Sequence, residues 1–160
     1  MDRADLAVKQ WARERPDLRT LPMAVFGRLN EASERVKREH LNPLFAQAGL
    51  QPGEFDVLAT LRRSGAPYTL SPTRLYEAAM ISSGGMTDRL DRLESAGLVM
   101  RRPDPRDRRG KLIVLTDPGK RLIDEAIGRH VANEERLLLS LTQAEQETLD
   151  ALLKKLIAAL

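Results

Sequence analysis

The sequence predicts a mainly α-helical fold with a small antiparallel β-hairpin, and three observations carry this prediction. Apolar residues recur at helical spacing in the first third and in the last third of the chain. Between these regions lie two short helical segments joined by a tight connection, which is the pattern of a helix-turn-helix. Two apolar β-runs, 98–101 and 111–116, follow it with a basic turn between them. Together these features predict a winged helix-turn-helix.

The first half of the chain divides into helices at its proline and glycine residues. A short helix is expected over Asp5–Arg15, because Pro16 would interrupt it. A long amphipathic helix follows from Met23 to Phe45 and ends before Gly49. The next helix begins at Pro52, which suits a first turn, and stops near residue 65.

The two helices of the helix-turn-helix are predicted from their caps. Ser71 followed by Pro72 marks the start of the first helix. Ser82 or Ser83 is expected to cap the second, and Gly97 to end it. The buried face of this second helix holds Met86, Leu90, Leu93 and Gly97, and its outward face holds Gly84, Thr87, Asp88, Asp91 and Arg92.

The last third of the chain predicts two further helices and a dimer. Thr116 caps a helix that runs to about Leu139, and Thr142 with Glu145 forms a capping box for the last one. The last helix carries a broad apolar stripe, and the N-terminal helix is also apolar on one face. The core of one small winged helix is too small to bury both of them. We therefore expect a homodimer. The second helix of each helix-turn-helix, called the recognition helix, would then lie roughly 34 Å from its copy, on a pseudo-palindromic DNA site. Residues 1–160 would form one domain, with 1–48 and 117–160 for dimerisation and 49–116 as the DNA-binding lobe.

Composition narrows the class of protein. The formal net charge is only +3, but residues 89–111 hold eight basic and four acidic side chains, so positive charge is concentrated there. The chain has no cysteine, which excludes disulfides and thiol chemistry. It has no apolar run long enough to span a membrane, and charged residues occupy the region where a signal peptide would be apolar. A cytoplasmic location is expected.

The predicted DNA contacts lie at the start of the second helix and at the tip of the hairpin. Small polar residues there suit phosphate and base-edge contacts, and arginines at the tip suit a narrow minor groove. The predicted contact residues are Ser82, Ser83, Gly84, Gly85, Thr87, Arg92, Arg106, Arg108 and Arg109. Asp107 is expected to brace the turn, since phosphates repel a carboxylate. Asp88 and Asp91 on the outward face indicate that only the first turns of the helix enter the groove.

Enzymatic classes have little support. His40 and His130 stand far apart without metal-ligand spacing, and no phosphate-binding loop or nucleophile elbow is present. No catalytic residue, metal or cofactor is therefore predicted. A winged helix used for protein–protein interaction is the alternative from another class, but such a module would not need three arginines at the turn.

The chain resembles the MarR family of transcriptional regulators. The resemblance lies in four segments. In chain order these are Leu93-Glu-Ser-Ala-Gly-Leu-Val99, Arg101-Arg-Pro103, Asp107-Arg-Arg109 and Leu115-Thr116-x-x-Gly119. The resemblance extends from the long amphipathic helix that begins at Met23 to the apolar stripe of the last helix. It implies a dimeric winged helix-turn-helix repressor that a small ligand releases from its operator.

A narrower resemblance points to the urate-responsive, PecS-like branch. It rests on Trp11, Glu54–Gly65, Pro67-Tyr68, Pro72-Thr73 and Ser82–Arg89. It implies a pocket for an anionic purine, with Trp11, Asp56, Arg89 and Arg101 as ligand-binding residues. An aromatic face, guanidinium groups and a carboxylate suit urate, a flat and weakly acidic heterocycle.

Other interpretations of these four positions remain open. The simpler interpretation of Trp11 is that it packs the N-terminal segment against the rest of the protein. The simpler interpretation of Asp56 is that its carboxylate interacts favourably with the dipole at the start of its helix. A phenolic compound or an organic acid such as a citrate analogue is the alternative effector. Arg89, at the edge of the buried face, could point inward, and one hypothesis is that it pairs with Asp56. A ligand that competed for either partner would then pull on the recognition helix.

Overall fold

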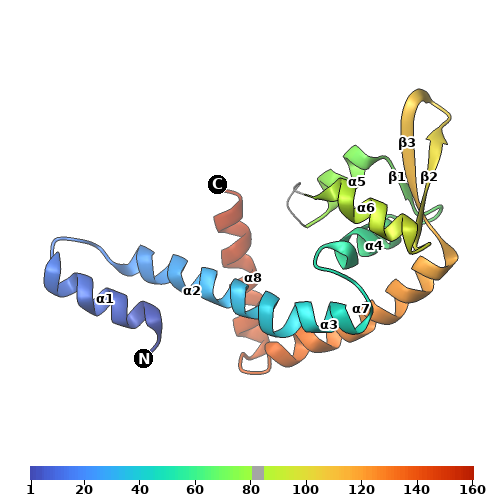
Figure 1. Cartoon of the computed structure of the whole chain (residues 1–160). Coiled ribbons are helices and arrows are strands. Elements are labelled where there is room, and N and C mark those ends of the chain that lie inside the picture. The colour runs from blue at the N-terminus through green and yellow to red at the C-terminus, as the bar shows by residue number, and fades with distance from the viewer. Residues whose placement is uncertain (81–84) are drawn as a thin grey trace. The chain divides into compact units, whose positions relative to one another are not determined.

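The computed structural model describes residues 1–80 and 85–160, except for the side chains of residues 108 and 109. The described residues form helices and one small antiparallel sheet, which confirms the predicted fold class (Figure 1). The chain divides into two compact units, Met1–Ala46 and Gln47–Leu160.

The first unit is helical. Its elements are α1 (Arg3–Glu14), α2 (Leu21–Arg35), the π-helix η1 (Val36–Leu41) and α3 (Asn42–Gln47), whose last residue already belongs to the second unit. A reciprocal capping box starts α1: the Asp2 carboxylate accepts the Asp5 N–H at 2.8 Å, and the Asp5 carboxylate accepts the Asp2 N–H at 3.1 Å. Arg28 of α2 donates to both carboxylates. Asp2 therefore both caps α1 and fixes it to α2.

The second unit contains the winged helix-turn-helix and two further helices. Its elements are α4 (Glu54–Arg63), β1 (Thr69–Leu70), α5 (Pro72–Ala78), α6 (Met86–Ser95), β2 (Val99–Asp104), β3 (Asp107–Leu115), α7 (Asp117–Leu137) and α8 (Gln143–Ile157). Its core is built from side chains that are almost completely buried: Val57, Leu58, Leu61, Leu75, Leu93, Val99, Ile113 and Ile123. The core thus joins α4, α5, α6, the sheet and α7.

The sheet has the order β1-β3-β2, and both pairings are antiparallel. Val99 pairs with Leu115 at the base of the β2–β3 hairpin, and Asp104 pairs with Asp107 at its tip. This hairpin projects beyond the helices of the second unit (Figure 1). The sequence did not predict β1, because two residues are too few to show an alternating pattern.

The helix termini confirm most of the predicted caps. Thr116 caps α7 by accepting the Gly119 N–H at 3.1 Å, and Thr142 forms a capping box with Glu145. Gly97 ends α6 with a φ of 70°, which favours glycine. The predicted cap at Ser82 or Ser83 is wrong: α6 begins at Met86, and its N-cap is Gly85 with a φ of 78°. A left-handed backbone at this position explains why a glycine occupies it.

The base of the hairpin is tied to the start of α7 through two successive backbone carbonyls. The Thr116 N–H donates to the Leu98 carbonyl oxygen at 3.1 Å, and the Thr116 hydroxyl lies within hydrogen-bonding distance of the Gly97 and Leu98 carbonyl oxygens, at 2.7 and 2.9 Å. Gly119 lies so close that a Cβ atom there would stand 2.1 Å from the Leu98 oxygen. Gly119 therefore allows the helix and the hairpin to approach each other.

Apolar side chains are left exposed on α2 and α8. On α2 the most exposed are Leu21 and Phe26, with 68% and 52% of their surface accessible. On α8, Leu152 and Ile157 are 60% and 70% exposed. Several large apolar side chains exposed on one helix are typical of an interaction surface. No helix in the described part of the chain is long and apolar enough to cross a membrane.

Candidate nucleic-acid interface

The helix-turn-helix is formed by α5 and α6. The Ser71 hydroxyl accepts the Arg74 N–H at 3.2 Å, which fixes the start of α5. On α6, Leu90 and Leu93 are buried, while Thr87, Asp88 and Arg92 are exposed. The predicted division of α6 into a buried and an outward face is thus confirmed over residues 86–95. Three predicted contact residues, Ser82, Ser83 and Gly84, lie outside the described residues.

Arg101 of β2 fastens α6 to the hairpin. Its guanidinium donates to Asp91 Oδ1 at 2.6 Å and to Glu94 Oε2, and its backbone N–H donates to Glu94 Oε1 at 2.9 Å. Asp91 and Glu94 lie one turn apart on α6, so a single arginine reaches both. This pairing gives Asp91, an exposed carboxylate on α6, a structural partner. Arg101 balances its charge locally.

The Arg101 contacts also make the attachment of α6 sensitive to acid. The backbone N–H and the guanidinium of Arg101 hold the pKa of Glu94 below its ordinary value of 4.5. A carboxyl whose pKa is lowered by folding stabilises the fold above its unfolded pKa, and this contribution is lost as the pH falls through the folded pKa. We expect unfolding experiments to show a loss of stability below about pH 4.5. Glu94→Gln should make the free energy of unfolding fall less steeply with pH in this acidic range. An unchanged pH dependence would contradict the role assigned to Glu94.

Asp56 of α4 contacts the connection between α5 and α6. Its Oδ2 accepts the Met80 N–H at 2.7 Å. Partial burial raises the pKa of Asp56, and the Met80 N–H and the charges of Arg63 and Arg89 oppose this shift. Arg89, on α6, lies against Gly53, where a Cβ atom would stand 2.6 Å from its Nε. The structure therefore brings Asp56 and Arg89, two predicted ligand residues, into electrostatic range across α4 and α6.

The other two predicted ligand residues occupy different surroundings. Arg101 is paired with the two carboxylates on α6. Trp11 lies on α1 in the first unit, with 41% of its surface exposed.

Glu54, the first residue of α4, contacts the exposed Arg92. Its Oε1 accepts Arg92 Nε at 2.7 Å, and its Oε2 accepts the Gln51 N–H at 2.7 Å. Only 5% of Glu54 is exposed. Sequence reasoning missed this residue, because a glutamate in the first turn of a helix is ordinarily explained by the helix dipole alone. Its place among buried neighbours at 55, 57 and 58 was the available signal.

The tip of the hairpin is a tight turn between β2 and β3. The Asp104 carboxylate accepts the Arg106 N–H at 2.9 Å, and Arg106 itself is exposed. Asp107 lies over Gly110, where an added Cβ atom would stand 3.0 Å from the Asp107 side chain. Asp104 was not predicted to brace this turn. The side chains of residues 108 and 109 lie outside the described part of the structure.

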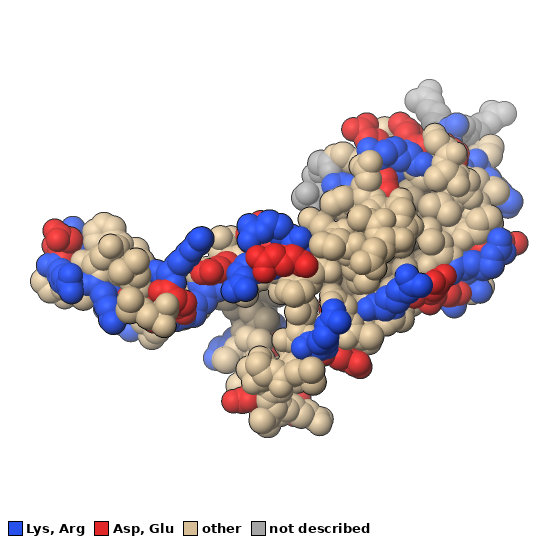
Figure 2. Space-filling view, turned by 60° about the horizontal axis from the view of Figure 1, so that its bottom comes forward, with Lys and Arg blue, Asp and Glu red and all other residues tan. Residues whose placement is uncertain are grey.

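Charge is mixed on the face of the molecule that Figure 2 shows. Lysine and arginine side chains alternate with aspartate and glutamate side chains over both units. The described residues contain no cluster of three or more potential metal ligands.

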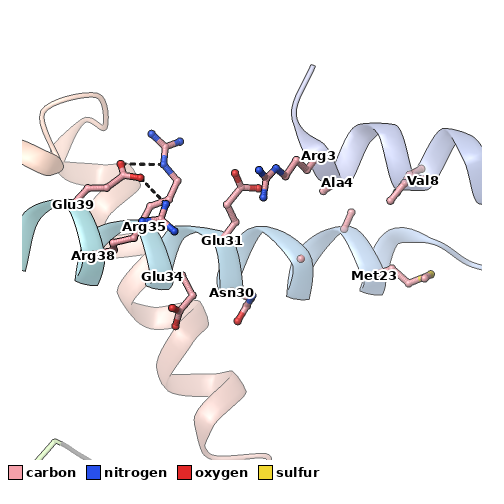
Figure 3. A pocket seen from close by; sticks show the side chains of 13 residues that line it. Arg3, Ala4, Val8, Met23, Asn30, Glu31, Glu34, Arg35, Arg38 and Glu39 are labelled. Atoms are coloured by element: carbon pink, nitrogen blue, oxygen red, sulfur yellow. Dashed lines mark hydrogen bonds and ion pairs between the residues drawn. The ribbon is translucent and has the colours of Figure 1, made fainter.

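A cavity of about 700 Å³ in the first unit is lined by residues of α1, α2 and η1. Ala4, Val8 and Met23 line its apolar end, and Arg35, Arg38 and Glu39 line the other (Figure 3). Glu39 pairs with both arginines, at 3.4 and 2.8 Å. None of the four predicted ligand residues is part of its lining.

The arrangement of α5, α6 and a basic hairpin defines a winged helix-turn-helix DNA-binding protein. Residues 48–110 match the model of the MarR family. The chain is 46% identical to the HTH-type transcriptional regulator PecS of Dickeya dadantii, over 91% of this chain and 87% of PecS. It belongs to the MarR family of transcriptional regulators.

Solved structures agree with this assignment. A mutant MarR from E. coli in complex with operator DNA superposes with a TM-score of 0.71 at 29% identity, over 91% of this chain and 96% of that one. BpsR from Bordetella bronchiseptica, whose DNA binding is regulated by 6-hydroxynicotinic acid, superposes with a TM-score of 0.66 at 26% identity, over 81% of this chain and 98% of BpsR.

Proposed function

We propose that this regulator is a homodimeric, cytoplasmic repressor that a small anionic ligand such as urate releases from a pseudo-palindromic operator. Residues 1–48 and 117–160 would form the dimer, and residues 49–116 would bind DNA. The exposed apolar residues of α2 and α8 support the dimer, because a second copy would remove them from water. The regulation of DNA binding in the related BpsR by 6-hydroxynicotinic acid supports a small acidic effector.

One observation carries the ligand-responsive part of the proposal: Asp56 contacts the turn of the helix-turn-helix and shares its electrostatic environment with Arg89 of α6. A bound anion would attract the Arg89 guanidinium, and a ring N–H of the ligand would donate to Asp56. Both contacts compete with interactions that hold α6 in place. The ligand and the DNA would then favour different positions of the same helix, as coupling between two sites requires.

Trp11 and Arg101 complete the proposed ligand set. An indole offers a flat apolar surface for a heterocycle, and Arg101 offers a second cation. Arg101 would have to exchange Asp91 or Glu94 for the ligand, which would loosen the hairpin from α6. DNA contacts are assigned to Ser82, Ser83, Gly84, Gly85, Thr87, Arg92, Arg106, Arg108 and Arg109, with Asp107 bracing the turn.

The direct test is fluorescence anisotropy with DNA from the intergenic region upstream of the protein's own gene, titrated with urate at fixed salt. Saturable binding of two chains per operator that urate reverses would support the proposal. Binding that urate leaves unchanged would reject the purine. An aromatic acid, 6-hydroxynicotinic acid, is the second ligand to test, because it regulates the DNA binding of BpsR.

Asp56→Asn is expected to reduce the urate response at least tenfold while DNA binding changes little. Asparagine keeps an oxygen that can accept the Met80 N–H, but it loses the negative charge beside Arg89. The measurement is the urate concentration that releases half of the bound DNA. Asp88→Asn is the matched control, since it removes an exposed carboxylate from α6. Equal urate sensitivity in wild type and Asp56→Asn would argue against this site.

A further inference from the structure

Glu54 is an unusual neighbour for a DNA-facing arginine because it is buried. Its side chain is 6% exposed, whereas that of Arg92 is 43% exposed. Both carboxylate oxygens are occupied: one accepts the Arg92 Nε–H, and the other accepts the N–H of Gln51, which lies two residues before the N-cap of α4. The Gln51 contact fixes the orientation of the carboxylate. Glu54 is therefore a stationary acceptor beneath a partly exposed guanidinium.

The atom of Arg92 that Glu54 engages is also informative. Nε is the guanidinium nitrogen nearest the aliphatic stem, so this ion pair does not require the two terminal nitrogens. A fixed Nε sets the plane of the guanidinium and the direction of its outer edge. A long arginine side chain normally loses much rotational freedom when it binds, and an arginine already held in place loses less.

We propose that Glu54 is a positioning residue for DNA binding, which holds the guanidinium of Arg92 in the orientation that contacts a DNA phosphate. The inference rests on the proposed role of α6 in contacting DNA. The direction in which DNA affinity changes when Glu54 is replaced distinguishes a positioning role from a simple charge effect. A carboxylate beneath the DNA-binding helix repels phosphates, so removing it should strengthen binding if it acts only through its charge. If it acts through Arg92, removing it should weaken binding.

The test is a double-mutant cycle on operator DNA, measured by fluorescence anisotropy at several salt concentrations, with wild type, Glu54→Gln, Arg92→Ala and the double variant. Arg92→Ala should weaken binding about tenfold and make the dependence of log K on log salt shallower by about one for each lost phosphate contact. Glu54→Gln should weaken binding about fivefold in the wild-type background and less than twofold in the Arg92→Ala background.

Two further variants keep the test decisive. Arg62 of α4 and Asp124 of α7 form an ion pair at 2.6 Å that does not involve α6. Asp124→Asn removes the charge of this pair and should change DNA affinity less than twofold. Arg92→Lys leaves Glu54 in place and keeps the charge but has no Nε–H. It should therefore weaken binding with little change in the salt slope, even if Glu54→Gln proves unstable.

The outcomes separate this inference from the proposed function. Tighter binding by Glu54→Gln, or an equal loss in both backgrounds, would overturn the positioning role. Full affinity of Arg92→Lys would overturn it as well. Failure of the wild-type protein to bind operator DNA would instead reject the proposed function.

Discussion

Replacing Gly119 with alanine is expected to lower the free energy of unfolding by about 3 kcal/mol. The new Cβ atom would stand 2.1 Å from the Leu98 carbonyl oxygen and 3.0 Å from the Leu115 side chain. The carbonyl cannot move away freely, because Thr116 also donates to it. The start of α7 and the base of the hairpin must therefore separate. For a chain of this size, the loss corresponds to a fall in Tm of about 6–12 °C.

Gly128 provides the matched control in the same helix. A Cβ atom there would meet nothing within 4 Å, and its backbone is helical. Gly128→Ala should therefore stabilise the protein by up to about 1 kcal/mol, through the better helix propensity of alanine. Urea unfolding at one protein concentration measures both variants. If Gly119→Ala matched or exceeded the wild type in stability, the close approach of α7 to Leu98 would be wrong.

Arg101→Ala is expected to weaken operator binding at least tenfold, or about 1.4 kcal/mol, even without a ligand. The substitution removes a cation and leaves Asp91 and Glu94 uncompensated on α6, the helix proposed to contact DNA. These carboxylates would repel phosphates, and α6 would lose its attachment to β2. Added salt screens exposed charges, so the affinity deficit should shrink as ionic strength rises. Anisotropy titrations at low and high salt measure this trend.

Arg102→Ala separates the attachment from the loss of charge alone. Arg102 is the next residue on β2, is exposed, and donates a hydrogen bond to the Met100 sulfur; no carboxylate in the described part of the chain forms an ion pair with it. Its removal costs the same formal charge but leaves Asp91 and Glu94 paired. We expect a loss of about threefold or less for this variant. Equal losses for the two variants would show that Arg101 contributes charge and no attachment.

The features that the sequence predicted correctly depend on short stretches of chain. Thr116 and Thr142 are recognisable as caps because the residues that complete each cap follow within three positions. Gly97 is recognisable as a helix end from its own identity, because glycine readily adopts the left-handed conformation that follows a helix. The start of α6 was misplaced, since two serines and two glycines in succession each suit an N-terminus, and only the backbone conformation at Gly85 decides between them.

The features that the sequence did not predict depend on which elements pack together. Arg101 pairs with Asp91 and Glu94 only because β2 returns alongside α6. From the sequence alone, Asp91 indicated that only the first turns of α6 enter a DNA groove, and Arg101 was a predicted ligand residue. Glu54 and Arg92 are separated by 38 positions in the chain, and no local pattern connects them. Asp56 and Arg89 were placed together because the family resemblance supplied the tertiary information.

The convergence of Thr116 and Gly119 on the Leu98 carbonyl has a consequence for where the hairpin tolerates substitution. The register of the hairpin is set at its base, from Val99 and Leu115 outward, and its tip is closed by Asp104. The residues that anchor the hairpin and the residues at its tip are therefore separate parts of one ladder. A substitution at the tip leaves the contacts at the base in place, so we expect it to cost far less folding stability than a substitution at Gly119.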